Sequence, residues 1–285
     1  MRIILFGSSG MLGQYIYLYL KDSYTIIPID SSIFNILTNS TLDLENLLNH
    51  HLLKNTTNDP MLIINCMGLI PQNQNKNLPQ SISRKNYYKI NAIFPQKLSL
   101  LANKYNMKMI HITTDCVFNG DIGNYNEDSI PDESNDYGMS KSLGEPDNCC
   151  VIRTSIIGEE VKNKKSLLEW VRENSGKTIN GYANHYWNGM TCLQLAKVIN
   201  EMISNKIYWY GVRHLFSPNS LSKFALIDMI NEIYNLNIIV NNINCDKPID
   251  KTLSTKYPLI FNIPSLYIQI EELYFYEIDI DIDID

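Results

Sequence analysis

The sequence predicts an α/β protein in which a doubly wound parallel sheet is followed by a smaller mixed lobe. Two observations indicate this fold class. Short apolar segments alternate with longer segments of helical periodicity from residue 2 to about residue 153. A glycine-rich run follows directly on the first apolar segment. After about residue 158 the alternation stops, and this change predicts the separate lobe.

The elements can be assigned in order along the chain. Five strands are expected in the first half, at Arg2–Phe6, Thr25–Ile29, Met61–Cys66, Met107–Thr113 and Cys149–Arg153. Four helices are expected between them, at Met11–Lys21, Leu42–Leu53, Ser83–Tyr105 and Tyr137–Glu145. The later part predicts helices at Leu167–Arg172, Cys192–Ile203 and Phe224–Tyr234 and a strand at Ile238–Val240. We therefore expect a first domain at 1–158, a lobe at 159–276 and an acidic low-complexity tail at 277–285.

Charge and cysteine content exclude several classes of protein. The net charge of -6 arises from the last sixteen residues, which hold seven acids and no lysine or arginine, whereas the other 23 acids balance 24 bases. No broad field would therefore attract nucleic acid or a membrane surface. No apolar run approaches the roughly 18 residues of a membrane span, and the start does not resemble a signal peptide. The six scattered cysteines predict neither a zinc site nor disulfides, so we expect a soluble cytoplasmic protein.

The glycine-rich run predicts a dinucleotide site of the Rossmann type. It reads Gly7-Ser8-Ser9-Gly10-Met11-Leu12-Gly13 and opens the first expected helix. Glycines at these spacings allow a tight turn, close approach of backbone N–H groups to a pyrophosphate, and close packing of helix on strand. The helix N-terminus adds partial positive charge. The first domain is therefore expected to bind a dinucleotide, with no metal.

Further cofactor contacts are expected at the ends of the next strands. Asp30 ends the second strand, where a carboxylate binds the adenosine ribose and repels a 2′-phosphate, which favours NADH. It is equally placed to cap the next helix. Cys66, Met67 and Gly68 follow the third strand, where a small residue lets the dinucleotide cross the sheet. Asn91 is either a buried packing amide or a support for a backbone carbonyl beside the nicotinamide.

A carbonyl reduction needs a proton donor and a hydroxyl that fixes the carbonyl oxygen. Tyr137 and Lys141 share one helix face, so the ammonium is expected to lower the pKa of the phenol from about 10 towards neutrality. Thr114 lies where the fourth strand ends, at the edge where such sheets bind ligands. A second pair with this spacing, Tyr17 and Lys21, has no hydroxyl at a preceding strand end. We therefore expect Thr114, Tyr137 and Lys141 to be catalytic.

Several motifs together resemble a known family. They are Gly7/Gly10/Gly13, Asn65-Cys66-Met67-Gly68, Thr114-Asp115-Cys116-Val117-Phe118, Tyr137/Lys141 and Arg153-Thr154-Ser155. The set resembles the extended short-chain dehydrogenases, in the dTDP-4-dehydrorhamnose reductase-like branch, over essentially the whole chain up to the tail. The stretches 166–170, 180–184 and 187–189 look like the subgroup that reduces UDP-linked 2-acetamido-2,6-dideoxy-hexuloses.

The resemblance implies a reductase of a keto-sugar carried on a nucleotide diphosphate. Thr114 would position the sugar C4 oxygen, Tyr137 would protonate it, and Lys141 would hold the nicotinamide ribose. Members of the family commonly accept NADPH, in conflict with the simple interpretation of Asp30, so we expect NADPH with NADH also accepted. A homodimer is expected. Two alternatives stay open: a nucleotide-sugar 4-epimerase with tightly bound NAD, and a non-catalytic regulatory subunit of the same fold.

The residues after Thr114 refine the expected reaction. Related 4,6-dehydratases place an Asp-Glu pair there, whereas this chain has Asp115 and Cys116, so dehydration is not expected. A cysteine at this place resembles the bifunctional GDP-fucose synthase type, in which Cys and His exchange protons beside the ketone. His185 would be the partner of Cys116 in C3 epimerisation. The alternative is a small core cysteine and a structural histidine.

Substrate contacts are also expected from the lobe. In the resembling family Arg or Lys clamps the nucleotide diphosphate, and each candidate is otherwise an ordinary surface charge or structural ion pair. The candidate cations are Arg153, Lys223 and Lys251. The remaining expected substrate contacts are Thr114, Asp115, Cys116, Asn184 and Trp187.

Overall fold

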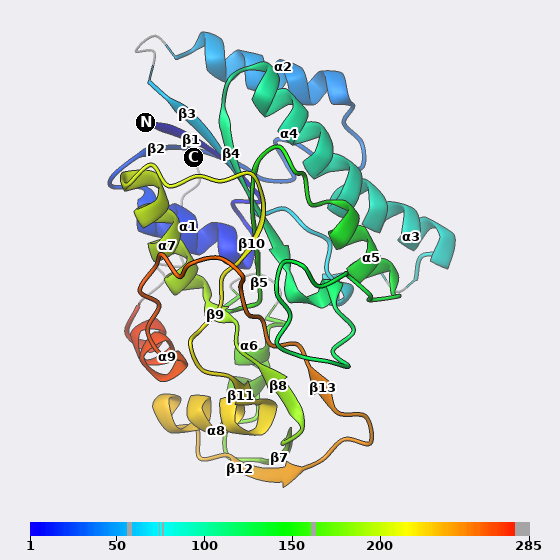
Figure 1. Cartoon of the computed structure of the whole chain (residues 1–285), viewed down its shortest axis with the longest axis vertical. Helices are drawn as coiled ribbons and strands as arrows, with labels where there is room; N and C mark the ends of the chain where they lie inside the picture. Colours follow the sequence, from blue (N-terminus) through cyan, green and yellow to red (C-terminus); the bar gives the residue numbers. More distant parts are fainter. Residues whose placement is uncertain (56–58, 74, 76, 161–163, 277–285) are drawn as a thin grey trace.

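A computed structural model describes residues 1–55, 59–73, 75, 77–160 and 164–276. Its main sheet has six parallel strands in the order β10-β5-β4-β3-β1-β2 (Figure 1). The strands are β1 (Arg2–Phe6), β2 (Thr25–Ile29), β3 (Met61–Asn65), β4 (Lys108–Thr114), β5 (Cys150–Thr154) and β10 (Gly211–His214). The predicted doubly wound sheet is therefore confirmed. The acidic tail at 277–285 lies outside the described residues.

Helices cover both faces of this sheet (Figure 1). On one face lie α1 (Met11–Leu20) and α7 (Cys192–Ser204), and on the other lie α2 (Thr41–Leu53), α4 (Phe94–Lys104) and α5 (Asp136–Leu143). Alternate residues of each strand feed the two cores, as in β1, where Ile3 and Leu5 face the α1 side and Ile4 and Phe6 face the α2 side. Burial on both faces explains why these strands are continuously apolar in the sequence.

The helix expected at Ser83–Tyr105 is three segments. It consists of α3 (Gln80–Tyr87), a π-helical segment (Tyr88–Ile93) and α4. Pro95 has no N–H to donate to the carbonyl of Asn91, and the N–H of Phe94 bonds instead to the carbonyl of Lys89, five residues back. A π-bulge at this point rotates Asn91 into the buried interior, where its side chain is 1% exposed.

The second lobe lies below the carboxyl edge of the sheet (Figure 1). It contains α6 (Leu167–Glu173), β7 (Thr178–Tyr182), β8 (His185–Trp187), β11 (Leu221–Ser222), α8 (Lys223–Tyr234), β12 (Ile239–Ile243), β13 (Ile249–Asp250) and α9 (Leu266–Phe275). Two short strands, β6 (Ile156–Ile157) and β9 (Met190–Thr191), pair where the chain passes between lobe and sheet. One continuous apolar core joins the lobe to the α1 face of the sheet.

The expected division at residue 158 does not follow the chain cleanly. After β7 and β8 have formed in the lobe, the chain returns to the sheet, where α7 packs on α1 and β10 adds an edge strand beside β5. Residues 190–214 therefore belong structurally with the first domain. The sequence analysis did not predict β10, because four residues at a sheet edge carry little periodic signal.

Candidate active site

The glycine loop has the geometry of a phosphate cradle. Gly7 has a φ of +80°, and a Cβ there would crowd the backbone of Cys66 and Met67 at about 3 Å. A Cβ at Gly13 would overlap the carbonyl oxygen of Gly7, so the first turn of α1 packs directly on the loop. Gly10 is the N-cap of α1, and the buried hydroxyl of Ser8 has no hydrogen-bond partner among the described residues. The predicted positions of Ser9, Met11 and Leu12 lie in the same loop and first turn.

Asp30 is placed as both sequence interpretations require, at the end of β2. One carboxylate oxygen accepts hydrogen bonds from the Ser32 N–H (2.9 Å), the Ser32 hydroxyl (2.6 Å) and the Ile33 N–H (3.3 Å). Asp30 therefore caps the turn at residues 31–33, whereas the next helix, α2, is capped by Ser40. The helix-capping interpretation is wrong, and the position at the end of β2 is the one expected for a ribose contact.

The floor of the site is formed where β3 ends. The Asn91 side chain accepts from the Leu69 N–H (2.7 Å) and donates to the Leu69 carbonyl (2.9 Å), which fixes the chain after Gly68. Asn91 also donates to the hydroxyl of Ser140 on α5 (3.1 Å). A Cβ at Gly68 would lie 3.6 Å from both Asn91 Oδ1 and Lys141 Nζ. The backbone of Gly68 is therefore open to a flat group that reaches Lys141.

Thr114, Tyr137 and Lys141 meet at the carboxyl edge of the sheet. The N-terminus of α5 is capped by Asn135, which accepts from the Gly138 N–H (2.8 Å) and so orients the turn that carries Tyr137. The Tyr137 phenol lies beside the Thr114 hydroxyl, close enough for Thr114 to affect its pKa. The ammonium of Lys141 donates to the Ile112 carbonyl (3.3 Å). The predicted set is brought together around one point.

The charges at this point differ from the sequence expectation. Burial raises the pKa of Tyr137, and the neighbouring Thr114 hydroxyl opposes that rise. The expected lowering by Lys141 is wrong for this arrangement. Burial instead lowers the pKa of Lys141 to about 8, while the nearby carboxylate of Glu145 opposes that fall. A phenol that keeps its proton is the form a proton donor requires.

The competing pair Tyr17 and Lys21 lies in a different environment. Tyr17 packs at the edge of the apolar core on α1, and Lys21 is the exposed C-cap residue of that helix. Tyr17 and Lys21 thus have the same spacing as Tyr137 and Lys141, but no contact with a strand-end hydroxyl such as that of Thr114 is described for them.

Asp115, Cys116 and Lys251 border the catalytic residues. Asp115 is 2% exposed and accepts from the Thr114 hydroxyl (3.1 Å); burial raises its pKa, and Lys251 opposes that rise. Burial also raises the pKa of the Cys116 thiol to about 12. Lys251 follows β13 of the lobe, and its ammonium lies 3.4 Å from a carboxylate oxygen of Glu133. The lobe thus brings one predicted cation to the active site.

Three other predicted substrate residues have partners elsewhere. The His185 ring stacks against Tyr182, with centroids 4.7 Å apart, and its Nε2 lies 3.3 Å from the Lys247 carbonyl. No hydrogen bond joins it to Cys116 in the described part of the chain. The Asn184 amide is committed to both backbone groups of Cys245. Trp187 packs against the core, and a Cβ at Gly189 would overlap its ring.

For Arg153 the structure shows a structural ion pair in place of the expected phosphate clamp. The Arg153 side chain is 4% exposed and forms a two-pronged ion pair with Glu145, at 3.1 and 2.6 Å. Because both carboxylate oxygens and the guanidinium are buried together, Arg153 is not available as a phosphate clamp. Lys223 is the first residue of α8 in the lobe, and the structure describes no contact between it and the catalytic residues.

A comparison with known protein families decides the class. The model described as the RmlD substrate binding domain matches residues 1–256. The chain belongs to this RmlD family. The branch expected from the sequence is thereby confirmed. No curated protein matches the chain. Membership of the RmlD family and the reductase relatives below confirm the expected enzyme class, an oxidoreductase.

Solved structures with the RmlD-family fold cover nearly the whole chain. A dTDP-4-dehydrorhamnose reductase from Bacillus anthracis, in complex with NADP, has 22% identity and a TM-score of 0.78, covering 96% of this chain and 98% of its own. One from Clostridium acetobutylicum has 19% identity, a TM-score of 0.75 and the same coverages. A hypothetical dTDP-4-dehydrorhamnose reductase from Sulfolobus tokodaii has 26% identity, a TM-score of 0.70 and coverages of 89% and 92%.

Sequence reasoning missed several residues of this RmlD-family site. Glu133 fixes Lys251 and packs against Gly138, where a Cβ would overlap it. The Tyr87 ring lies 6.1 Å from the Tyr137 ring. Glu145 and His214 are the buried partners of the predicted Arg153. None of them forms a local motif, so only the tertiary structure shows their association.

Proposed function

We propose that this protein reduces the 4-keto group of a 6-deoxyhexose linked to a nucleotide diphosphate, with NADPH preferred and NADH accepted. The observation that carries the proposal is the placement of the Tyr137 phenol beside the Thr114 hydroxyl at the strand edge, with the ammonium of Lys141 held at the Ile112 carbonyl and beside Gly68. The family and the reductase relatives support the same reaction. The alternative of a subunit without turnover is disfavoured by this assembled set.

The residues present fit a dinucleotide. The unpartnered buried hydroxyl of Ser8 lies in the cradle that Gly7 and Gly10 leave open, at the N-terminus of α1. At the other end, Gly68 leaves room beside Lys141. When bound, the reduced nicotinamide supplies the hydride. The loop would hold the pyrophosphate, and Lys141 the ribose next to the nicotinamide.

The chain's own residues account for the other half of the reduction. The hydroxyls of Thr114 and Tyr137 converge, so both can hold the keto oxygen of the sugar. The raised pKa of Tyr137 keeps its phenol protonated until negative charge develops on that oxygen, and the phenol proton then moves to it. Lys141, as an ammonium, stabilises the phenolate that remains. Lys251, paired with Glu133, is placed to contact the sugar nucleotide from the lobe side.

Reduction without epimerisation at C3 is part of the proposal. The Cys116 thiol has a pKa of about 12, which makes it a poor base at neutral pH, and His185 contacts Tyr182 and Lys247 instead. Running the reaction in D2O tests this directly. Deuterium at C3 of the product would show that a proton-exchanging pair operates after all.

The experiment that tests the main proposal is a substrate panel. NADPH and NADH oxidation should be followed with dTDP- and UDP-linked 4-keto-6-deoxy sugars, including dTDP-4-keto-rhamnose and UDP-2-acetamido-2,6-dideoxy-hexuloses. We expect oxidation with at least one of them and a purified protein free of bound cofactor. Stoichiometric retained NAD with an epimerised product would instead identify a 4-epimerase.

The location and assembly of the protein belong to the same proposal. The structure describes no helix that is long and apolar enough to cross a membrane. All six cysteines are free thiols, as suits a reducing compartment. We therefore propose a cytoplasmic homodimer. Fractionation and light scattering test the two parts separately.

A further inference from the structure

A buried chain of polar side chains runs behind the active site, from the end of α5 to the lobe. The ion pair between Glu145 and Arg153 is its first link, with side chains 6% and 4% exposed. Arg153 Nη1 lies 2.9 Å from Nε2 of His214 on the edge strand β10. His214 is 2% exposed. These side chains are far too buried to serve as an ordinary surface ion pair.

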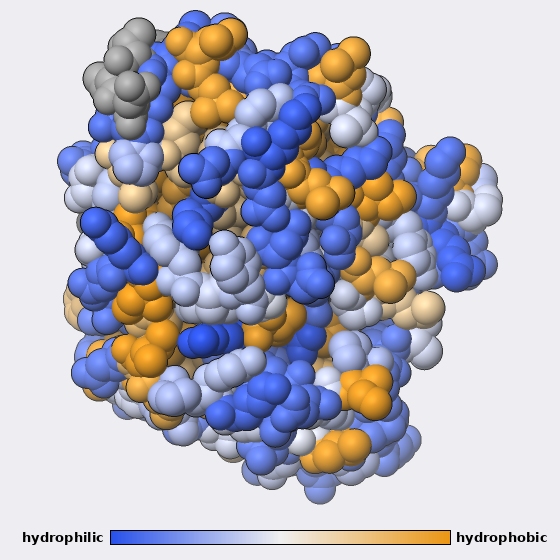
Figure 2. Space-filling view, turned by 45° about the horizontal axis from the view of Figure 1, so that its top comes forward, coloured by the Kyte–Doolittle hydropathy of each residue, from blue (hydrophilic) through white to orange (hydrophobic). Residues whose placement is uncertain are grey.

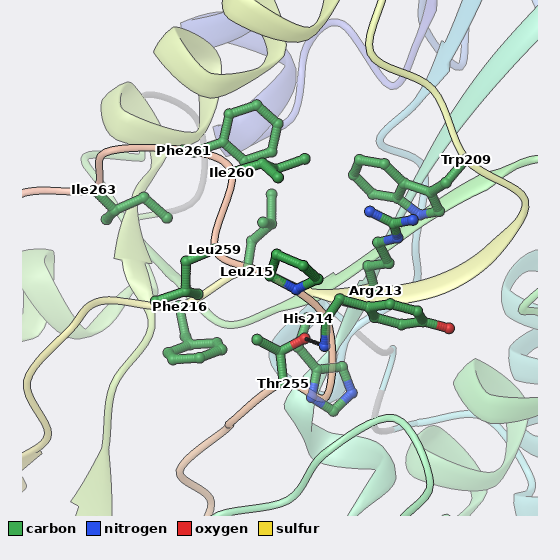
Figure 3. Close-up of a pocket in the computed structure, with 12 residues that line it drawn as sticks. Trp209, Arg213, His214, Leu215, Phe216, Thr255, Leu259, Ile260, Phe261 and Ile263 are labelled. Atoms are coloured by element: carbon green, nitrogen blue, oxygen red, sulfur yellow. Dashed lines mark hydrogen bonds between the residues drawn. The ribbon is translucent and has the colours of Figure 1, made fainter.

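The hydrogen bonds fix the tautomer of His214. A guanidinium can only donate, so Nε2 of His214 must accept. The proton is therefore on Nδ1, which donates to the Ser254 carbonyl at 2.8 Å and lies 3.1 Å from the Tyr125 carbonyl. A neutral imidazole thus joins β5 to two segments outside the sheet. Figure 3 shows that its neighbour Arg213 points the other way, towards Trp209.

Both ends of this chain reach catalytic elements. Glu145 lies just after the C-cap of α5, and its carboxylate opposes the fall in the pKa of Lys141 that burial causes. Ser254 lies three residues after Lys251, and its N–H donates to the Tyr125 carbonyl at 2.7 Å. Arg153 also lies over the ring of Phe118, 5.0 Å from its centroid, immediately after the segment that begins with Thr114.

We propose that Arg153 and His214 are a positioning pair for the active site. They fix the segment 250–255, which carries Lys251, against the end of the catalytic helix α5. Neither residue touches the reacting atoms. The catalytic consequence rests on the proposed function, whereas the fixing of segment 250–255 can be measured without any substrate.

The charged groups around His214 are consistent with a neutral ring. Arg153 faces it from β5, with Glu145 behind the guanidinium. Glu127 faces it from the loop after Phe118, accepts from its backbone N–H at 2.8 Å, and also accepts from the Thr255 hydroxyl at 2.6 Å. Burial, followed by Arg153, lowers the pKa of His214 to about 4, so the ring stays neutral under ordinary conditions.

The test compares two substitutions at one position. His214→Leu removes both hydrogen bonds, whereas His214→Gln keeps an acceptor and a donor on a neutral side chain. Met202→Ala in α7, on the opposite face of the sheet, is the control for general loosening. If His214→Leu does not fold, Arg153→Lys replaces it, because it keeps a charge opposite Glu145 while losing the forked geometry.

Hydrogen exchange followed by mass spectrometry gives the first readout. In His214→Leu, the peptide spanning 249–256 should exchange at least about tenfold faster, as expected for the loss of a hydrogen bond to a charged network. His214→Gln should change this rate by less than about twofold, and Met202→Ala should leave it unaltered. Unchanged exchange in 249–256 for His214→Leu would overturn the proposal.

Kinetics give the second readout. For His214→Leu, KM for the nucleotide sugar should rise about tenfold with the Kd for NADPH within about twofold, and His214→Gln should restore KM. If exchange accelerates but KM and kcat stay as in the wild type, the pair is structural only and the positioning role is wrong. If the wild type reduces no sugar in the panel, the proposed function fails. In that case, protection of the peptide 249–256 from hydrogen exchange by added dTDP or UDP replaces the kinetic readout. If His214→Leu shows the same protection as the wild type, the positioning role is wrong.

Discussion

Tyr137 and Tyr17 have the same spacing to a lysine but opposite surroundings. Tyr137 meets Thr114 at the sheet edge, whereas Tyr17 packs on the core from α1. Tyr137→Phe should reduce kcat by about 10² to 10⁴, the usual contribution of a general acid, with cofactor affinity nearly unchanged. The matched control Tyr17→Phe should stay within a few-fold of the wild type. Equal losses in the two variants would show that the wrong pair had been chosen.

Two substitutions separate the charge of Asp30 from its hydrogen bonds to the turn at residues 31–33. Asp30→Asn keeps an oxygen that can accept from Ser32 but removes the charge, whereas Asp30→Ala removes both. If the charge repels a 2′-phosphate, both variants should raise the ratio of kcat/KM for NADPH over NADH by about tenfold, or about 1.4 kcal/mol. Only Asp30→Ala should also lower the thermal midpoint. An unchanged cofactor ratio in both would leave Asp30 as a cap alone.

At the scale of elements, substitutions at two glycines of the loop should have different effects, one on stability and the other on cofactor binding. A Cβ at Gly13 would overlap the Gly7 carbonyl oxygen, whereas a Cβ at Gly10 would lie 3.4 Å from it. Gly13→Ala should therefore cost about 1 to 3 kcal/mol of overpacking and lower the thermal midpoint by several degrees. Gly10→Ala should change the midpoint little and weaken NADPH binding instead. Similar midpoints for the two variants would contradict the packing described for α1.

Elements that depend on a local sequence pattern could be predicted from the sequence, whereas elements that depend on contacts between distant residues could not. The five strands of the first half lie within one residue of their expected bounds at each end, because burial on both faces gives continuous apolar runs. Thr114, Tyr137 and Lys141 could be predicted because strand ends in such sheets converge. The π-helical segment could not be predicted, because it combines Pro95 with tight packing of Gly144 against Asn91, 53 residues away.

Arg153 shows the limit of the same reasoning at the site. An arginine at a strand end in a family that binds phosphates suggests a clamp, whereas the structure shows the other alternative, a structural ion pair with Glu145. Its carboxylate partner is eight residues away and its imidazole partner 61 residues away. A buried charge of this kind is defined by partners from other elements, and no pattern around residue 153 indicates them.

At the scale of the whole molecule, two buried neutral histidines make stability depend on acidity. Burial, followed by a nearby cation, lowers the pKa of His111 to about 3 and that of His214 to about 4, below the ordinary value of 6.5. The unfolded chain therefore takes up protons first. Their contribution to the free energy of unfolding is complete above pH 6.5 and is lost by roughly 1.4 kcal/mol per pH unit for each ring as the pH falls towards 4.

His214→Gln tests this dependence, because glutamine does not titrate. The thermal midpoint of the wild type should fall as the pH is lowered from 6.5 to 4, and the fall should be shallower in the variant. Calorimetry at several pH values gives both slopes. Parallel slopes would mean that His214 binds a proton equally well in the folded and unfolded protein.

The surface gives no single feature that would dominate association. Figure 2 shows apolar side chains scattered among polar ones on the face that it presents. The exposed apolar residues come from many elements, including α2, α4, β12 and α9. We therefore expect substrate recognition to depend on the residues around Thr114 and Lys251 more than on a broad surface field.

The return of residues 190–214 to the main sheet has a consequence for engineering. A chimaera that exchanged everything after residue 158 for the corresponding part of another reductase would also remove α7 and the edge strand β10. A graft that keeps the nucleotide fold intact has to replace two separate stretches, about 158–189 and 215–276, and retain what lies between. His214 is the last retained residue, so a transplanted lobe that lacked a carbonyl at the position of Ser254 would leave the His214 N–H with only the Tyr125 carbonyl as acceptor.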